Sequence, residues 1–187
     1  MTPLLKIIIG STRPGRIGPV VGKWVKMAVE THGGCRVELV DLADFNLPLL
    51  DEPNHPAMQQ YKHEHTRTWA TTIAEADGYI FVTPEYDYFP PASLVNAVQT
   101  LFLEWNYKAA GIVSYGGVSG GLRSCQALRS LLSGVNVHGI YHVVPIPFVS
   151  QSINGGRFVP TGQTSDGLNL MLGELLKWTR ALKPMRS

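Results

Sequence analysis

The stretch that decides the fold reads Leu4-Leu5-Lys6-Ile7-Ile8-Ile9-Gly10-Ser11-Thr12-Arg13-Pro14-Gly15-Arg16-Ile17-Gly18. An apolar run stops at a glycine, and a loop of hydroxyls, glycines and two arginines leads into a helical pattern of apolar residues. Such a junction directs backbone N–H groups, the positive end of a helix and guanidinium groups at one small volume. The sequence therefore predicts a strand-to-helix unit with an anion site, most simply for a phosphate, at its turn.

Five predicted strands alternate with five helical patterns along the rest of the chain. The strands are expected at Leu4–Ile9, Arg36–Asp41, Gly78–Thr83, Gly111–Tyr115 and Tyr141–Pro145, the helices at about 17–32, 57–76, 92–105, 119–134 and 164–182, and a loop at 151–164. The first, third and fourth strands are nearly continuous apolar runs, which is typical of strands covered on both faces. The alternation predicts a flavodoxin-like three-layer α/β sandwich, with a five-stranded parallel sheet in the order 2-1-3-4-5 and helices on both faces. A truncated Rossmann sheet is the alternative.

Length and composition indicate one ordinary globular domain. The 187 residues are expected to form a single domain, residues 1–187, because domains average roughly 150 residues. A net charge of +2 gives no indication of nucleic-acid binding, and no apolar stretch approaches the roughly 20 residues of a membrane span. Cys35 and Cys125 form no metal or redox motif, and His63 and His65 have no third ligand nearby, so no metal site is predicted. We expect reduced cysteines in a cytoplasmic protein without a signal peptide.

Four loops are expected to meet at the carboxyl ends of the strands. They are residues 10–18, 42–56, 84–91 and 115–121. Ligands of open α/β sheets bind at this edge, near the change in strand order. The glycines at 10, 15 and 18 fit neither the dinucleotide fingerprint nor the P-loop pattern, which excludes those two kinds of nucleotide site.

Two of these loops suit a flat ring. The segment 84–91 is rich in proline and aromatic residues, and its backbone N–H groups from Glu85 to Asp87 are expected to reach the edge of such a ring. The segment 116–121 holds four glycines, which permit close approach of the backbone to a ligand.

Five motifs at or near these loops carry a family resemblance. They are Gly10-Ser11-Thr12-Arg13, Pro48-Leu49-Leu50-Asp51-Glu52-Pro53, Thr83-Pro84-Glu85-Tyr86 with Asn96-Ala97, Glu104-Trp105, and Val113-Ser114-Tyr115-Gly116-Gly117. Together they resemble the NADPH-dependent FMN reductase family, flavodoxin-like reductases of quinones, azo compounds and flavins, over about residues 4–150.

The resemblance implies a function and a set of binding residues. It implies bound FMN, NADPH or NADH as hydride donor, a small oxidised acceptor (a quinone, azo or nitro compound, or free flavin), and a homodimer or homotetramer. FMN would carry the chemistry, so no catalytic side chain is assigned. The implied phosphate ligands are Ser11, Arg13 and the turn of Arg16, Ile17 and Gly18, and the implied ring contacts are Pro84, Glu85, Tyr86 and Asp87 at the isoalloxazine edge and ribityl side and Ser114, Tyr115, Gly116 and Gly117 at the pyrimidine end.

Three consecutive residues depart from the family pattern. Asp87 replaces an asparagine, and Tyr88 and Phe89 stand where small residues are common. An ionised carboxylate donates no hydrogen bond and repels an anionic reduced flavin, and the two rings would narrow or fill the acceptor pocket. A non-catalytic FMN-binding carrier or interaction module is therefore the alternative to an enzyme. Ser119 lies in a Gly-x-Ser-x-Gly pattern, which makes a serine hydrolase a third, weaker hypothesis.

Overall fold

The computed structural model describes residues 2–186, and a five-stranded parallel sheet forms its centre. The strands are β1 (Leu4–Ile9), β2 (Arg36–Asp41), β3 (Gly78–Pro84), β4 (Lys108–Tyr115) and β5 (Val137–Ile146). Their order is β2-β1-β3-β4-β5, and every neighbouring pair is parallel. The strand order predicted from the sequence is confirmed.

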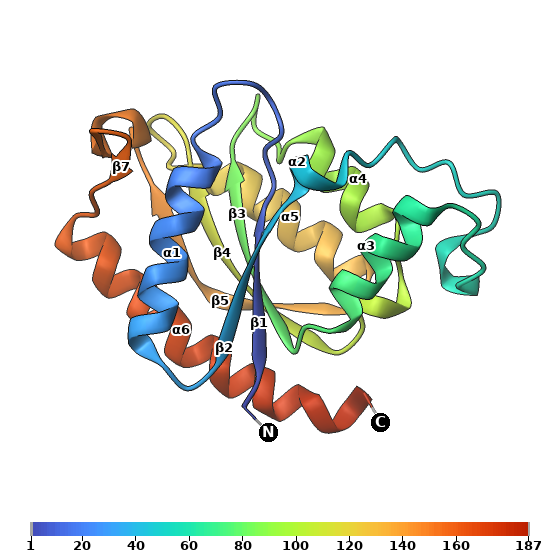
Figure 1. Ribbon diagram of the computed structural model, residues 1–187. Helices are drawn as coiled ribbons and strands as arrows, with labels where there is room; N and C mark the ends of the chain where they lie inside the picture. The colour runs from blue at the N-terminus through green and yellow to red at the C-terminus, as the bar shows by residue number, and fades with distance from the viewer. Residues whose placement is uncertain (1, 187) are drawn as a thin grey trace.

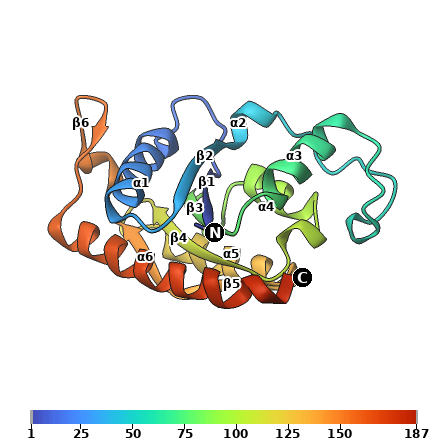
Figure 2. The same cartoon turned by 60° about the horizontal axis from the view of Figure 1, so that its bottom comes forward.

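Helices cover both faces of the sheet, as Figures 1 and 2 show. The α-helices are α1 (Gly18–His32), α2 (Leu42–Phe45), α3 (Glu64–Ala74), α4 (Ala92–Gln99), α5 (Leu122–Gly134) and α6 (Gly162–Leu182), and the short 3-10 helices are η1 (Pro56–Met58), η2 (Leu103–Trp105), η3 (Val149–Ser152) and η4 (Lys183–Arg186). Helices α1 and α6 pack on one face, and α3, α4 and α5 pack on the other. This is the predicted three-layer sandwich.

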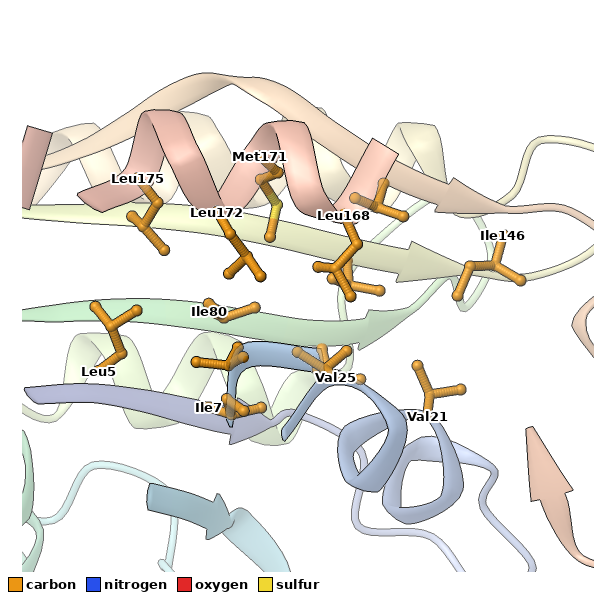
Figure 3. Packing of buried hydrophobic residues seen from close by; sticks show 14 of the residues in the cluster. Leu5, Ile7, Val21, Val25, Ile80, Ile146, Leu168, Met171, Leu172 and Leu175 are labelled. Atoms are coloured by element: carbon orange, nitrogen blue, oxygen red, sulfur yellow. The ribbon is translucent and has the colours of Figure 1, made fainter. Parts of the chain in front are cut away.

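The core beneath α1 and α6 comes from alternate residues of the central strands. Figure 3 shows Leu5 and Ile7 of β1 and Ile80 of β3 in one cluster with Val25 of α1 and Leu172 of α6. Every residue of β1, β3 and β4 is buried, because helices cover both of their faces. The three continuous apolar runs therefore became the three central strands, as expected for strands without a solvent face.

The opposite face is built around aromatic rings. Trp69 and Trp105 are fully buried there with Tyr79 and Phe81. The indole N–H of Trp69 donates to the carbonyl of Ala97 at 2.8 Å, so its one polar atom is satisfied inside the core.

The structure differs from the sequence expectation where long-range hydrogen bonds override local pattern. The helix expected at 57–76 begins only at Glu64, because the Glu52 carboxylate accepts the backbone N–H groups of Lys62 and His63 at 2.8 and 3.0 Å and fixes an extended residue before the helix. The segment expected to be loop at 151–164 contains a small antiparallel hairpin. Its strands are β6 (Ile153–Asn154) and β7 (Arg157–Phe158). No helix among residues 2–186 is long and apolar enough to cross a membrane.

Candidate functional site

Three loops gather at the carboxyl ends of the central strands, at the top of Figure 1. We call them the first loop (residues 10–17, after β1), the hairpin loop (residues 85–91, after β3) and the glycine loop (residues 116–121, after β4). The change in strand order lies here, since the chain moves from β1 to β2 on one side and from β3 to β4 on the other. This is the edge at which open α/β sheets bind ligands.

Side-chain hydrogen bonds join the three loops. Arg13 of the first loop donates from Nε to the Tyr86 hydroxyl at 3.1 Å. Ser119 of the glycine loop donates its hydroxyl to the Glu85 carboxylate at 3.0 Å. The hairpin loop therefore lies between the other two and contacts both.

The first loop presents unpaired backbone donors. Among residues 2–186, none accepts a hydrogen bond from the backbone N–H groups of Gly15, Arg16, Ile17 or Gly18. Ile17 is the N-cap of α1, and no side chain caps the helix there. Free N–H groups at the positive end of a helix attract an anion, and the exposed Arg13 guanidinium lies on the same loop.

Two expected ligand residues, Ser11 and Tyr115, contact each other instead of lying apart. Their hydroxyl oxygens are 3.3 Å apart, and both residues are buried. Gly18 packs against the same pair, since a Cβ added there would lie 2.5 Å from the Ser11 hydroxyl oxygen and 3.0 Å from that of Tyr115. Burial raises the pKa of Tyr115 to about 12, so its hydroxyl stays protonated at neutral pH. The Tyr115 hydroxyl thus lies beside Ser11 of the first loop, whereas its backbone ends the strand that leads into the glycine loop.

The Arg16 guanidinium is paired with a carboxylate of the protein. Its two terminal nitrogens contact the two Asp41 carboxylate oxygens at 2.7 and 2.8 Å, and Nη1 also donates to the Ser11 carbonyl at 2.8 Å. The hydrogen bonds that Arg16 donates to Asp41 raise the pKa of Arg16, and both side chains are 17% exposed. Arg16 thus braces the first loop against the end of β2, which differs from its expected role as an anion ligand.

The hairpin loop is a tight two-residue turn. Tyr86 and Phe89 exchange both of their backbone hydrogen bonds at 2.9 Å, with Asp87 and Tyr88 between them. Both central residues have positive φ, 47° for Asp87 and 74° for Tyr88, as a type I′ turn requires. The N–H of Glu85 donates to the Tyr115 carbonyl and that of Tyr86 to Phe89, so neither is free for a ring edge.

The rings of Tyr88 and Phe89 lie at the surface of the hairpin loop. They are 64% and 59% exposed, respectively. Residues 2–186 therefore leave both rings largely uncovered, and the expectation that they narrow or fill an acceptor pocket stays a prediction.

The Glu85 carboxylate fastens the hairpin loop to the start of α5. It accepts from the Ser119 hydroxyl, from the backbone N–H of Arg123 at 3.1 Å and from Arg123 Nη1 at 2.8 Å. Its side chain is only 9% exposed. Desolvation acts to raise the pKa of Glu85, but the hydrogen bonds from Ser119 and Arg123 outweigh it and the pKa is lowered. The Glu85 carboxylate is therefore ionised at neutral pH, and its hydrogen-bond donors come from Ser119 and Arg123.

The glycine loop leaves an open backbone edge. Gly116 donates to the Ile146 carbonyl, but no residue among 2–186 accepts from the N–H groups of Gly117 or Val118. A Cβ added at Gly117 would meet nothing within 4 Å, so the backbone there is accessible. Ser114 is buried and donates its hydroxyl to the Gly120 carbonyl at 2.9 Å, which makes it a support for the loop.

Two residues of the site, Asp41 and Arg123, were not singled out from the sequence. The register that pairs Ile9 with Asp41 brings the aspartate beside the first loop, so the strand order was the available signal. Arg123 lies one residue into α5, where a single sequence offers no signal that separates it from a solvated helical arginine.

The serine hydrolase hypothesis finds no support in the geometry. Ser119 contacts Glu85 and the N–H of Gly121, and no histidine of residues 2–186 hydrogen-bonds to it. His63 and His65 stack at 5.2 Å with Asp51 beside them, but no group of three or more His, Cys, Asp or Glu side chains in the described part of the chain could hold a metal ion.

Hollows of the surface occur at both ends of the sheet. One of about 260 Å³ adjoins the first loop and is lined by Thr12, Leu42, Ala43, Asn46, Leu47 and Ser93. A larger one of about 780 Å³ lies at the amino ends of the strands, beside Glu104 and Lys108. In its wall the buried Lys108 ammonium donates to the carbonyls of Ile73 and Ala74 and to the Tyr79 hydroxyl, which uses all three of its N–H groups. The larger hollow is thus remote from the three loops. Its lysine donates its hydrogen bonds to the end of α3 and to Tyr79.

A family model and sequence relatives match this chain. The model described as NADPH-dependent FMN reductase matches residues 3–151. An NAD(P)H-dependent FMN reductase of Schizosaccharomyces pombe is 44% identical over 123 residues, which are 65% of this chain and 62% of that protein. One from Nectria sp. is 38% identical over 133 residues, 68% of this chain and 66% of that protein. The chain is thus aligned with somewhat under two thirds of the length of each of these two relatives.

A solved structure shares the fold. The chain of a flavoenzyme NAD(P)H:(acceptor) oxidoreductase, FerB, from Paracoccus denitrificans superposes with a TM-score of 0.72 over 96% of this chain and 98% of that one. The two sequences are 18% identical, so this likeness establishes the fold alone.

Proposed function

Because this chain belongs to the NADPH-dependent FMN reductase family, we propose that it binds FMN and passes a hydride from NADPH or NADH to a small oxidised acceptor. Quinones, azo and nitro compounds and free flavin are the acceptor classes we propose. A cytoplasmic location, in keeping with the free Cys35 and Cys125, belongs to the same proposal.

The observation that carries the proposal is the set of unpaired backbone donors on the first loop and the glycine loop. The free N–H groups of Gly15 to Gly18 and the Arg13 guanidinium suit a phosphate. The free N–H groups of Gly117 and Val118 suit the carbonyl and nitrogen acceptors at a flavin's pyrimidine edge, and the missing Cβ at Gly117 allows that approach. The residues present therefore fit FMN, a molecule with a phosphate at one end and a flat polar ring at the other.

The chain's own residues bind and orient, and FMN when bound supplies the hydride chemistry. Arg13 and the start of α1 would hold the phosphate. Arg16 and Asp41 would keep that loop in shape, and Glu85 would hold the hairpin loop and the glycine loop at a fixed spacing. Ser11, Ser114 and Tyr115 would support these loops from beneath, since all three are buried.

The test of this function is an anaerobic titration. Protein loaded with FMN and given NADPH or NADH without oxygen is expected to lose its yellow flavin absorbance, and the absorbance should return when a quinone is added. Bound FMN that stays oxidised under NADPH and NADH would favour the non-catalytic carrier and overturn the enzyme.

Removal of the Arg13 guanidinium is expected to weaken FMN binding through the phosphate. Arg13→Ala should raise the FMN dissociation constant by about five- to 150-fold, since hydrogen bonds to a charged group contribute about 1–3 kcal/mol. Fluorescence titration of the apoprotein measures this change. Riboflavin, which lacks the phosphate, is the matched control, and its affinity should be nearly the same in both proteins. Equal weakening for both ligands would mean that Arg13 acts on the ring or on the fold.

Assembly into a homodimer or homotetramer completes the proposal. Exposed apolar side chains lie in two of the three loops, Phe89 at 59% in the hairpin loop and Val118 at 74% in the glycine loop. Apolar side chains gathered at one edge are typical of a surface that another chain covers. Light scattering at micromolar concentration should give twice or four times the chain mass, and a monomer there would contradict this part.

A further inference from the structure

The Tyr88 ring is fixed in place by a residue from another element. The Arg123 guanidinium carbon lies 4.0 Å from the centre of the ring, at the start of α5. Arg123 is itself held by Glu85, which accepts from both its backbone N–H and Nη1. The chain of contacts from Glu85 through Arg123 to Tyr88 therefore determines where this exposed ring stands.

The backbone of Tyr88 indicates that the ring has a use beyond the turn. Its φ of 74° is one that glycine or asparagine adopts readily and a tyrosine adopts with strain. Strained residues of this kind persist where surrounding contacts fix them, and they cluster at ligand sites. The turn alone would be better served by glycine, so the side chain is the feature to explain.

The ring is also free to receive a partner. Tyr88 is 64% exposed although Arg123 covers one of its faces, and no aromatic ring among residues 2–186 lies against it. It stands in the hairpin loop, which contacts both the first loop and the glycine loop. An immobilised and exposed ring, in a loop that contacts the other two loops at the ligand-binding edge of the sheet, is suited to stacking on a flat ligand.

We propose that Tyr88 is a stacking platform for planar aromatic acceptors, quinones and azo compounds, and that Arg123 is its positioning residue. This inference rests on the proposed function and names a determinant of its acceptor class. In the overall reaction NAD(P)H gives up a hydride and becomes NAD(P)⁺. The quinone takes up that hydride, relayed by the flavin, together with one proton from solvent, and becomes the hydroquinone.

A binding measurement tests the platform without turnover. In FMN-loaded oxidised protein with no nicotinamide present, Tyr88→Gly is expected to raise the dissociation constant of 1,4-naphthoquinone by about two- to tenfold, the range of one aromatic stacking contact. Tyr88→Phe keeps the ring and should bind as the parent does. Glycine suits the positive φ, so Tyr88→Gly is expected to fold, and Tyr88→Asn, which also tolerates that φ, separates the ring from backbone freedom.

The role of Arg123 is tested by coupling. Arg123→Ala should weaken naphthoquinone binding in the parent but have no further effect in the Tyr88→Gly background, because the ring it positions is gone. In steady-state assays of Arg123→Ala, the KM for naphthoquinone should rise several-fold more than the KM for ferricyanide, which has no aromatic ring. A purely structural role for Arg123 would change both acceptors alike.

The outcomes separate this inference from the proposed function. An unchanged or tighter naphthoquinone constant in Tyr88→Gly would overturn the platform, and a tighter one would mean that the ring obstructs the site. If neither NADPH nor NADH reduces the FMN bound to the parent protein, the proposed enzyme activity is overturned, whatever the binding constants show.

Discussion

Gly121→Ala is expected to lower the free energy of unfolding by about 3 kcal/mol or more, through combined backbone strain and overpacking. Gly121 has a φ of 81°, in the left-handed region, and is the N-cap of α5. A Cβ there would lie 2.7 Å from the backbone nitrogen and 2.8 Å from the carbonyl oxygen of Tyr115. These are atoms of a central strand paired on both sides, so they cannot move aside as the end of a flexible side chain could.

Urea unfolding of Gly121→Ala beside Gly173→Ala provides the measurement. Gly173 lies within α6, and a Cβ there would meet nothing within 4 Å. That substitution should stabilise the protein by about 0.5–1 kcal/mol, because alanine favours helix over glycine. FMN affinity should also fall in Gly121→Ala, since the glycine loop must shift. A Gly121→Ala protein as stable as the parent would show that this turn relaxes without difficulty.

The second large effect concerns pH and the buried Lys108. Burial, with the nearby Arg186 adding to it, lowers the pKa of Lys108 from its ordinary 10.5 to about 7. Between these two values the unfolded chain binds more protons at this lysine than the folded protein does, so the stability contributed at this position rises with pH. The contribution is complete above pH 10.5 and is lost as the pH falls to about 7.

Lys108→Met removes this titration. The free energy of unfolding of the parent minus that of Lys108→Met should therefore increase by on the order of 4 kcal/mol from about pH 6 to about pH 10.5. Denaturant unfolding at several pH values measures the difference, in which the groups common to both proteins cancel. Lys23→Met, an exposed lysine of α1, controls for the loss of one positive charge. A difference that is flat with pH would mean that Lys108 stays charged in the folded protein.

The architecture could be predicted from the sequence because its signals are local. The uninterrupted apolar runs of β1, β3 and β4 are what strands between two helical layers require, and they became the central strands. The strand expected at Gly111–Tyr115 begins three residues earlier, at Lys108. Its ammonium is accommodated by the carbonyls of Ile73 and Ala74, which are about 35 positions away along the chain.

The location of the site could be predicted from the sequence, but the roles of several of its residues could not. The loops that meet at the sheet edge follow from strand order, and Arg13 and Tyr86 do contact each other there. Arg16 looked like a ligand because nothing in the sequence shows that Asp41 neutralises it. Glu85 likewise looked like a ring contact, whereas its partners Ser119 and Arg123 lie more than 30 positions further on. Pairings across such separations are set by the tertiary structure, and a single sequence does not display them.

The pairing of Arg16 with Asp41 has a consequence for how an anion would associate with the first loop. A glycine-containing loop loses conformational entropy when a ligand orders it, and that loss is subtracted from affinity. Here two charge-assisted hydrogen bonds to Asp41 and one to the Ser11 carbonyl already restrict the loop. Binding would then resemble the docking of rigid partners, with an association rate governed by diffusion and by the attraction of Arg13.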